Sequence, residues 1–293
     1  MEILVRATPV KLSNFRWDLS VNYAKNRNKV IALADGLETF TVAQARWAGA
    51  TITGDVGETF GSIYGVDFTY NDKGQMIMSG GKPVYSSAPV VLGNTTPDWT
   101  GGITNSFTWK GLELRAVIDI RVGGDLFSMS NLNMYGQGVA PATIPGRDGW
   151  NEYSRERRAW TDGGSVGPEP TQNNRGYIAP GAKDDGTAND VAISPSEYWR
   201  SVTENTPRPF IYDGGFVKLR DIGLNYTLPK SMYRKVPVQN ITVGIIGRNL
   251  WIISKNTPNI DPESNYNNGN GQGFEYGSLP GRQRYGFNVL IKL

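Results

Sequence analysis

The sequence predicts an all-β fold, an antiparallel meander of about seven long strands that together form an open curved sheet. Two observations lead to this prediction. Apolar and polar residues alternate with period two in several segments, and the links between those segments alternate between short and long. The composition agrees, since 36 Gly, 17 Pro, 14 Tyr and only 19% charged residues favour turns and strands over charged helices.

The first strand is expected at residues 2–8 and the second at residues 14–23. In the second, Phe15, Trp17, Leu19, Val21 and Tyr23 share one face, and polar residues occupy the other. Such a strand separates two different environments.

The same alternation continues along the chain. It predicts strands at residues 98–109, 112–121, 221–228, 240–245 and 284–293. The apolar positions should form one convex surface, comprising Phe15, Trp17, Leu19, Trp99, Ile103, Ile118, Ile120, Ile241, Val243, Phe287 and Val289. Their polar neighbours, including Arg16, Asp18, Asp119 and Asn225, should line the concave side.

The links between these strands are short at residues 9–13, 110–111 and 229–237, and long at residues 26–97, 123–212 and 254–281. Short turns on one side and long loops on the other are typical of outer-membrane β-barrels. A soluble sandwich has mostly short connections at both ends. The pattern therefore predicts a barrel wall whose C-terminus lies on the periplasmic, short-turn side.

Some local structure is expected within the long links. Residues 62–70 and 75–79 should form a hairpin around a turn at residues 71–74, and residues 126–135 and 153–160 should be short helices. Residues 163–195 are rich in Gly, Pro, Asn and Asp, and should be irregular.

Several classes of function are disfavoured by composition. The chain has 0 Cys and 0 His, which excludes disulfides, thiolate nucleophiles and the common zinc and haem ligand sets. The first residues lack the pattern of a signal peptide, and no apolar run reaches the length of about 20 that a membrane helix requires. Scattered Lys and Arg with a formal charge of +3 do not indicate nucleic-acid binding.

The acidic clusters do not predict a catalytic or metal site. Asp184, Asp185 and Asp190 form one cluster; Asp261 and Glu263 form a second, followed by Asn265, Asn267, Asn268 and Asn270. Calcium accepts such oxygen ligands, but their spacing fits no EF-hand, and Asn/Asp/Gly-rich stretches are usually turns. No pair suited to glycosidase chemistry can be identified. We therefore expect no catalytic residue, no metal and no cofactor.

The long links also carry many aromatic residues. Exposed aromatic faces bind sugars and peptides, although the same residues can form a small loop core or an interfacial girdle. Arg248 and Asn249 either contact a ligand or satisfy backbone groups at the rim. The candidate contacts for a substrate or a lid are Trp150, Tyr153, Trp160, Tyr177, Trp199, Phe210, Arg248 and Asn249.

Longer motifs resemble the C-terminal barrel portion of SusC/RagA-type TonB-dependent outer-membrane transporters. They occur in family order at residues 26–30, 92–102, 123–127, 215–229, 247–251 and 261–263, with a terminal strand after residues 280–282. The final residue, Leu293, departs from the family, in which an aromatic residue commonly ends the barrel.

This resemblance implies a barrel of about 22 strands, of which residues 1–293 are the C-terminal part, without the plug domain and the N-terminal strands. It implies an outer-membrane importer of oligosaccharides or peptides that works with a SusD-like lipoprotein and the TonB complex and contacts membrane lipid. The alternatives are a soluble, secreted glycan-binding β-sandwich and a secreted glycosidase.

Overall fold

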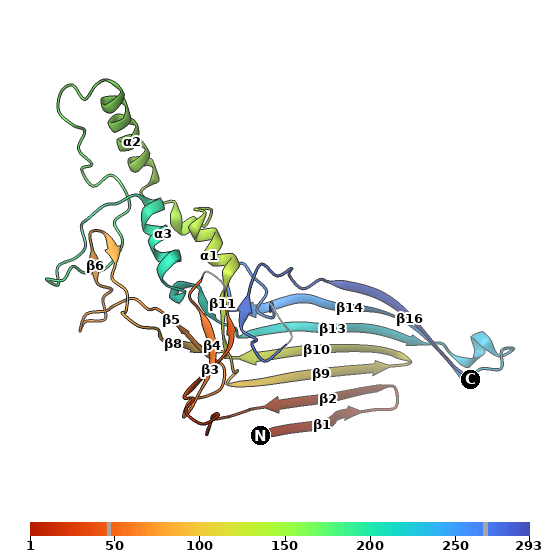
Figure 1. The fold of residues 1–293 in the computed structure, drawn as a ribbon. Coiled ribbons are helices and arrows are strands. Elements are labelled where there is room, and N and C mark those ends of the chain that lie inside the picture. Colours follow the sequence, from red (N-terminus) through yellow and green to blue (C-terminus); the bar gives the residue numbers. More distant parts are fainter. Residues whose placement is uncertain (46–47, 266–268) are drawn as a thin grey trace.

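A computed structural model of the chain describes residues 1–45, 48–265 and 269–293. Its main sheet has seven strands, and the six neighbouring pairs are all antiparallel (Figure 1). The strands, in sheet order, are β1 (Glu2–Lys11), β2 (Phe15–Ala24), β9 (Trp99–Trp109), β10 (Leu112–Val122), β13 (Phe216–Thr227), β14 (Asn240–Lys255) and β16 (Arg284–Lys292). The predicted meander is therefore confirmed.

The sheet is open, with β1 at one edge and β16 at the other, as predicted. The expected end of the first strand at residue 8 was wrong, because β1 continues to Lys11. A register shift between Ala7 and Val10 accommodates Pro9. Proline cannot donate to a ladder, but an edge strand tolerates it at such an irregularity.

Cross-strand register puts the predicted apolar residues on one face. Trp17 lies opposite Phe107 and their rings stack at 5.8 Å. Ile118 lies opposite Ile103, and Val243 lies opposite Val289. None of the eleven positions is buried, and Phe287 is 86% exposed. A β-sandwich would bury this face against a second sheet, so the exposure contradicts the sandwich alternative.

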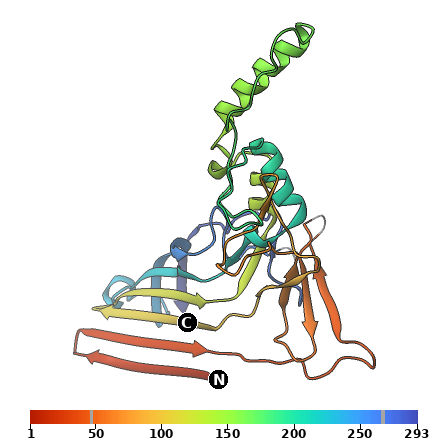
Figure 2. The ribbon, with the colours of Figure 1, turned by 90° about the vertical axis from the view of Figure 1, so that its left-hand side faces the viewer.

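The three long links gather at one end of the sheet and the short turns at the other, as both views show (Figures 1 and 2). The arrangement predicted from the link lengths, with long loops on one side and short turns on the other, is therefore confirmed. The C-terminus lies at the short-turn end (Figure 1).

The long links fold together into a module that the sequence predicted only in part. It contains a four-stranded sheet of β3 (Thr39–Gln44), β4 (Thr51–Asp55), β5 (Ser62–Gly65) and β8 (Val90–Asn94). It also contains the pair β6 (Met78–Ser79) and β7 (Lys82–Pro83), and a small sheet of β12 (Ile211–Asp213), β11 (Asp125–Ser128) and β15 (Phe274–Glu275). Its helices are α1 (Met129–Gly136), α2 (Arg147–Asp162) and α3 (Pro195–Asn205).

Three local predictions need correction. The expected helix at residues 126–135 begins only at Met129, because residues 125–128 form strand β11, which pairs with β12 and β15. The helix expected at 153–160 is longer, and α3 was not predicted. The turn at residues 71–74 forms, with Asn71 N donating to Gln75 O, but residues 62–65 pair with β4 and β8 instead of forming the hairpin.

The hydrophobic core lies in this loop module and draws on all three long links. Its largest members include Ile52 and Ile63 from the first link, Phe127 and Phe210 from the second, and Phe274 from the third. Distant segments are thereby held together at one end of the main sheet. None of the helices in the described part of the chain combines the length and apolarity needed to cross a membrane.

Candidate functional site

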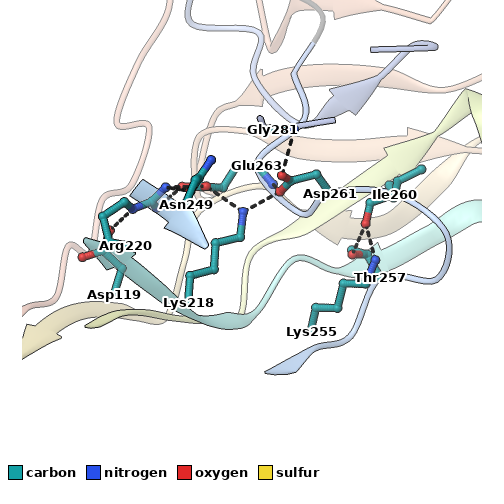
Figure 3. Close-up of polar contacts among 10 residues, drawn as sticks. All are labelled: Asp119, Lys218, Arg220, Asn249, Lys255, Thr257, Ile260, Asp261, Glu263 and Gly281. Atoms are coloured by element: carbon teal, nitrogen blue, oxygen red, sulfur yellow. Dashed lines mark hydrogen bonds and ion pairs between the residues drawn. The ribbon is translucent and has the colours of Figure 1, made fainter. Parts of the chain in front are cut away.

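A buried ion pair joins the main sheet to the third long link. Nζ of Lys218, on β13, lies 2.5 Å from Oδ1 of Asp261 and 2.7 Å from Oε2 of Glu263 (Figure 3). The Lys218 side chain is only 2% exposed. Because a buried ammonium is costly without partners, the two carboxylates are what make this position tolerable for lysine.

Arg220 extends the pair into a network across three strands. Its Nε lies 2.5 Å from Oδ2 of Asp119 on β10, and its Nη2 lies 2.6 Å from Oε1 of Glu263. Its Nη1 donates to Oδ1 of Asn249 on β14 at 3.0 Å. β13 has a register shift at Arg220, between Leu219 and Asp221. Asn249 has a left-handed backbone (φ 56°). The two backbone irregularities therefore occur at Arg220 and Asn249, the residues whose side chains point into the network.

The backbone of the third link completes the anchor. The amide of Gly281 donates to Oδ2 of Asp261 at 3.2 Å, and Nζ of Lys255 donates to the carbonyl of Ile260 at 2.6 Å (Figure 3). The link is thus fixed over the polar face of β13 and β14.

The surroundings of Asp261 and Glu263 favour their charged forms. Burial alone raises the pKa of Asp261, but hydrogen bonds, of which that from Lys218 is the largest, outweigh it and leave the pKa below its ordinary value. The pKa of Glu263 is lowered despite burial in the same way, mainly by Arg220 and then by Lys218. With their charges already matched by protein cations, these two residues make a poor calcium site.

The described residues contain no group of three or more His, Cys, Asp or Glu able to hold a metal. Asn267 and Asn268, considered above as possible ligands, lie outside the described residues. In the other acidic cluster, Asp190 pairs with Lys183 at 3.1 Å and Asp185 accepts from the Thr187 amide at 2.9 Å. Asp185 therefore stabilises a local turn, and Asp190 is paired with a protein cation.

A cavity of about 540 Å³ lies beside the ion network, between the polar face of the sheet and the third link. Its polar lining includes Asn22, Thr100, Asp119, Arg121 and Gln272. The polar face is the one that carries Asp18, Asp119 and Asn225, whose cross-strand partners include Ser106, Lys218 and Glu113. In a closed barrel this face would line the interior.

The structure brings some of the aromatic candidates together. Tyr177 and Trp199 have ring centroids 6.0 Å apart, and both pack against the module core. Phe210 is fully buried and packs against Tyr135 at 5.4 Å. In this conformation Phe210 supports the module and presents no face to a ligand.

The remaining aromatic candidates belong to α2. Trp150 and Tyr153 contact each other at 5.5 Å near its start, whereas Trp160 near its end donates to the carbonyl of Gly167. Trp150 and Trp199, distant in sequence, both line a second cavity, of about 280 Å³. Contact of these residues with substrate or lid stays a prediction.

Arg248 and Asn249 lie on β14 but have different surroundings. Arg248 is 62% exposed, lies opposite Asp221 and pairs with it at 3.3 Å. Asn249 belongs to the ion network described above. Because that contact is with the Arg220 side chain, the role of either residue in satisfying backbone groups at the rim stays a prediction, as does a ligand role.

Sequence reasoning missed Lys218, Arg220 and Glu275. Glu275 is 1% exposed and accepts five hydrogen bonds, from the hydroxyls of Ser128 and Ser130 and the amides of Ser130, Gly277 and Ser278. It links β15 to the start of α1. A lysine two residues after Phe216 on the same strand face is a signal that could have indicated a buried charge; Glu275 carries no comparable signal.

Two curated proteins from Formosa agariphila match almost the whole chain. TonB-dependent receptor P3 is 23% identical over 319 residues, covering 99% of this chain and 28% of the receptor. TonB-dependent receptor P26 is 26% identical over 305 residues, covering 95% of this chain and 27% of the receptor. This chain resembles a TonB-dependent receptor. No family model matches the sequence.

Solved structures agree in fold. The RagAB peptide transporter superposes with a TM-score of 0.60 at 18% identity, covering 99% of this chain and 28% of that chain. The RagAB peptide importer in its closed-closed state gives a TM-score of 0.61 at 17% identity, with the same coverage. The chain spans less than a third of the length of these proteins. The predicted resemblance to a RagA-type TonB-dependent transporter is confirmed, as is the barrel-type sheet.

Proposed function

We propose that residues 1–293 form the C-terminal section of the barrel wall, together with outer loops, of an outer-membrane nutrient importer. The observation that carries this proposal is the exposed apolar face shared by seven consecutive strands. Water would not tolerate such a face on an isolated sheet, whereas lipid covers it at little cost. The opposite face is polar and suits an aqueous interior. The two edge strands, β1 and β16, would each be paired on both sides in a closed barrel.

The whole importer would take up oligosaccharides or peptides, driven by the TonB complex and assisted by a SusD-like lipoprotein. RagAB is a peptide transporter or importer, and the likeness in fold supports transport without fixing the substrate here. The described residues supply wall and loops. α2 supports the role of a lid contact, because it projects beyond the rest of the module (Figure 2) and none of its residues is buried.

Uptake by cells tests this proposal. Deletion of the gene should abolish import of one labelled class, oligosaccharide or peptide, and an uncoupler that collapses the proton gradient should do the same in wild-type cells. Restored import on complementation is the expected control. Unchanged import of both classes after deletion would contradict the importer role.

The lid contact can be tested separately. Replacing residues 147–162 with a flexible Gly/Ser linker removes α2 without removing a buried side chain. The complete protein should still assemble, but it should no longer copurify with its lipoprotein. Copurification at the wild-type level would show that the lid binds elsewhere.

Two measurements test the rivals. Partitioning into detergent would agree with the exposed apolar face, whereas partitioning into aqueous buffer would restore the soluble glycan-binding domain that this exposure contradicts. A secreted glycosidase should hydrolyse oligosaccharides in a way that depends on one Asp or Glu.

A further inference from the structure

The cavity of about 280 Å³ lies where α1, α2 and α3 approach one another. Tyr135 at the end of α1, Trp150 on α2 and Trp199 on α3 line it with aromatic side chains. Each of the three is partly exposed, so part of their aromatic surface is not buried in the module core and faces the cavity. A cavity of this size has room for about one sugar ring or one side chain.

Unused hydrogen-bonding groups surround this aromatic surface. Gln137, Asn151 and Ser196 line the cavity, are exposed, and make no side-chain hydrogen bond to the described residues. Planar amides and hydroxyls next to aromatic rings are suited to the alternating apolar faces and hydroxyl edges of a pyranose.

The charge of the cavity is one-sided. Arg147 lines it and donates from Nε to the carbonyl of Thr143 at 2.8 Å, and from Nη2 to the Thr143 hydroxyl at 2.6 Å and to the carbonyl of Gly138. It forms no ion pair with the described residues, and no Asp or Glu is among the lining residues. A guanidinium without a carboxylate partner favours an anionic group on the ligand.

We propose that this cavity, whose lining residues we call the α1–α3 pocket, binds one anionic pyranose unit of an oligosaccharide. The proposal rests on the importer function and narrows its substrate class. Trp150 and Trp199 would flank the ring, Gln137 and Asn151 would bond its hydroxyls, and Arg147 would attract its carboxylate or sulfate. The pocket has no Asp or Glu among its lining residues to pair with a basic peptide.

Binding to the complete transporter in detergent tests the pocket. The probes are a tetra-uronate, the same tetramer with its carboxylates reduced to neutral hydroxymethyl groups, a sulfated tetramer and tetraglutamate, each titrated by calorimetry. The tetra-uronate, the sulfated tetramer or both should bind at least about tenfold more tightly than the neutral tetramer, and whichever binds identifies the anion. Trp150→Ala should weaken that binding about tenfold, and Trp150→Phe much less.

A matched pair at Ser196 separates charge from folding. Ser196 is exposed in the first turn of α3, where Asp is favourable to a helix. Ser196→Asp should therefore preserve the fold and weaken anionic binding by at least about tenfold, while Ser196→Asn should not. Equal binding by Ser196→Asp, equal affinity for the neutral tetramer, or binding of tetraglutamate alone would overturn the proposal. If those results accompanied normal uptake by cells, the importer function would stand and only the pocket would fail.

Discussion

Lys218 and Asp261 lie 43 residues apart in sequence, yet Nζ of the lysine is 2.5 Å from Oδ1 of the aspartate. Both side chains are nearly excluded from solvent, at 2% and 9% exposure. The pair connects a strand of the wall to a loop that covers its polar face, and it is the most buried contact of the network that holds this loop.

Removing one member of this pair should destabilise the protein strongly. Lys218→Met leaves Asp261 buried without its cation, and such a loss costs about 3–5 kcal/mol. The folded fraction of the complete barrel, read from unheated gel mobility across a urea series, measures it. Arg248→Gln is the matched control: its cation is 62% exposed, although Asp221 is 15% exposed, and the pair should contribute at most about 1 kcal/mol. Equal losses in both variants would contradict the importance of burial.

Acid should release the third link. The pKa values of Asp261 and Glu263 are lowered in the folded state, so the unfolded chain binds protons more readily. Their stabilisation is therefore fully present above the ordinary carboxyl pKa of about 4 and is lost as pH falls through the folded values. Proteolysis of residues 256–281 should stay constant between about pH 7 and pH 5 and then rise below about pH 4. In Lys218→Met the rise should begin at higher pH; an unchanged profile would contradict this account.

Neighbouring isoleucines on β14 test which face meets lipid. Ile245 is 63% exposed and lies opposite Phe287, whereas Ile246 is on the other face, opposite Gly286. Ile245→Arg should cost about 2–4 kcal/mol near the bilayer midplane, and Ile246→Arg should cost much less. Assembly into the outer membrane, followed by heat-modifiable gel mobility, measures both. If Ile245→Arg assembled as well as Ile246→Arg, the apolar face would not be the lipid face.

Glu275 should be essential to the order of the loop module. Glu275→Ala leaves its five donors without their acceptor, and hydrogen bonds to a charged group are worth about 1.5–3 kcal/mol each before relaxation. We expect rapid proteolysis of the long links while the barrel remains heat-modifiable. Glu204→Ala, at an exposed position with no ion pair in the described part of the chain, should stay within about 0.5 kcal/mol. Similar proteolysis of both variants would show that Glu275 is dispensable.

The isolated chain should aggregate in water. β1 and β16 are unpaired edges beside an apolar face, and both features promote association. Light scattering during removal of detergent should rise. A monodisperse, detergent-free monomer would refute this prediction.

The sequence by itself determined the strands, their two faces and the sides on which loops and turns lie. Period-two alternation reports a strand directly, because successive side chains point to opposite faces. The apolar residues from Phe15 to Val289 could therefore be assigned to one surface before any coordinates were known. Link lengths then fixed the topology, since consecutive antiparallel strands must reverse at alternate ends.

Only the tertiary structure decided how the long links fold and which of their side chains meet. The partners of Lys218, the acceptor role of Glu275 and the shared cavity of Trp150 and Trp199 all depend on segments that are far apart in sequence. No periodic pattern in a single sequence reports such contacts. The β5 segment shows the same limit: its local pattern fitted a hairpin, but the segment pairs with β4 and β8, and Ile63 is fully buried there. Burial of apolar surface between distant segments outweighed local propensity there.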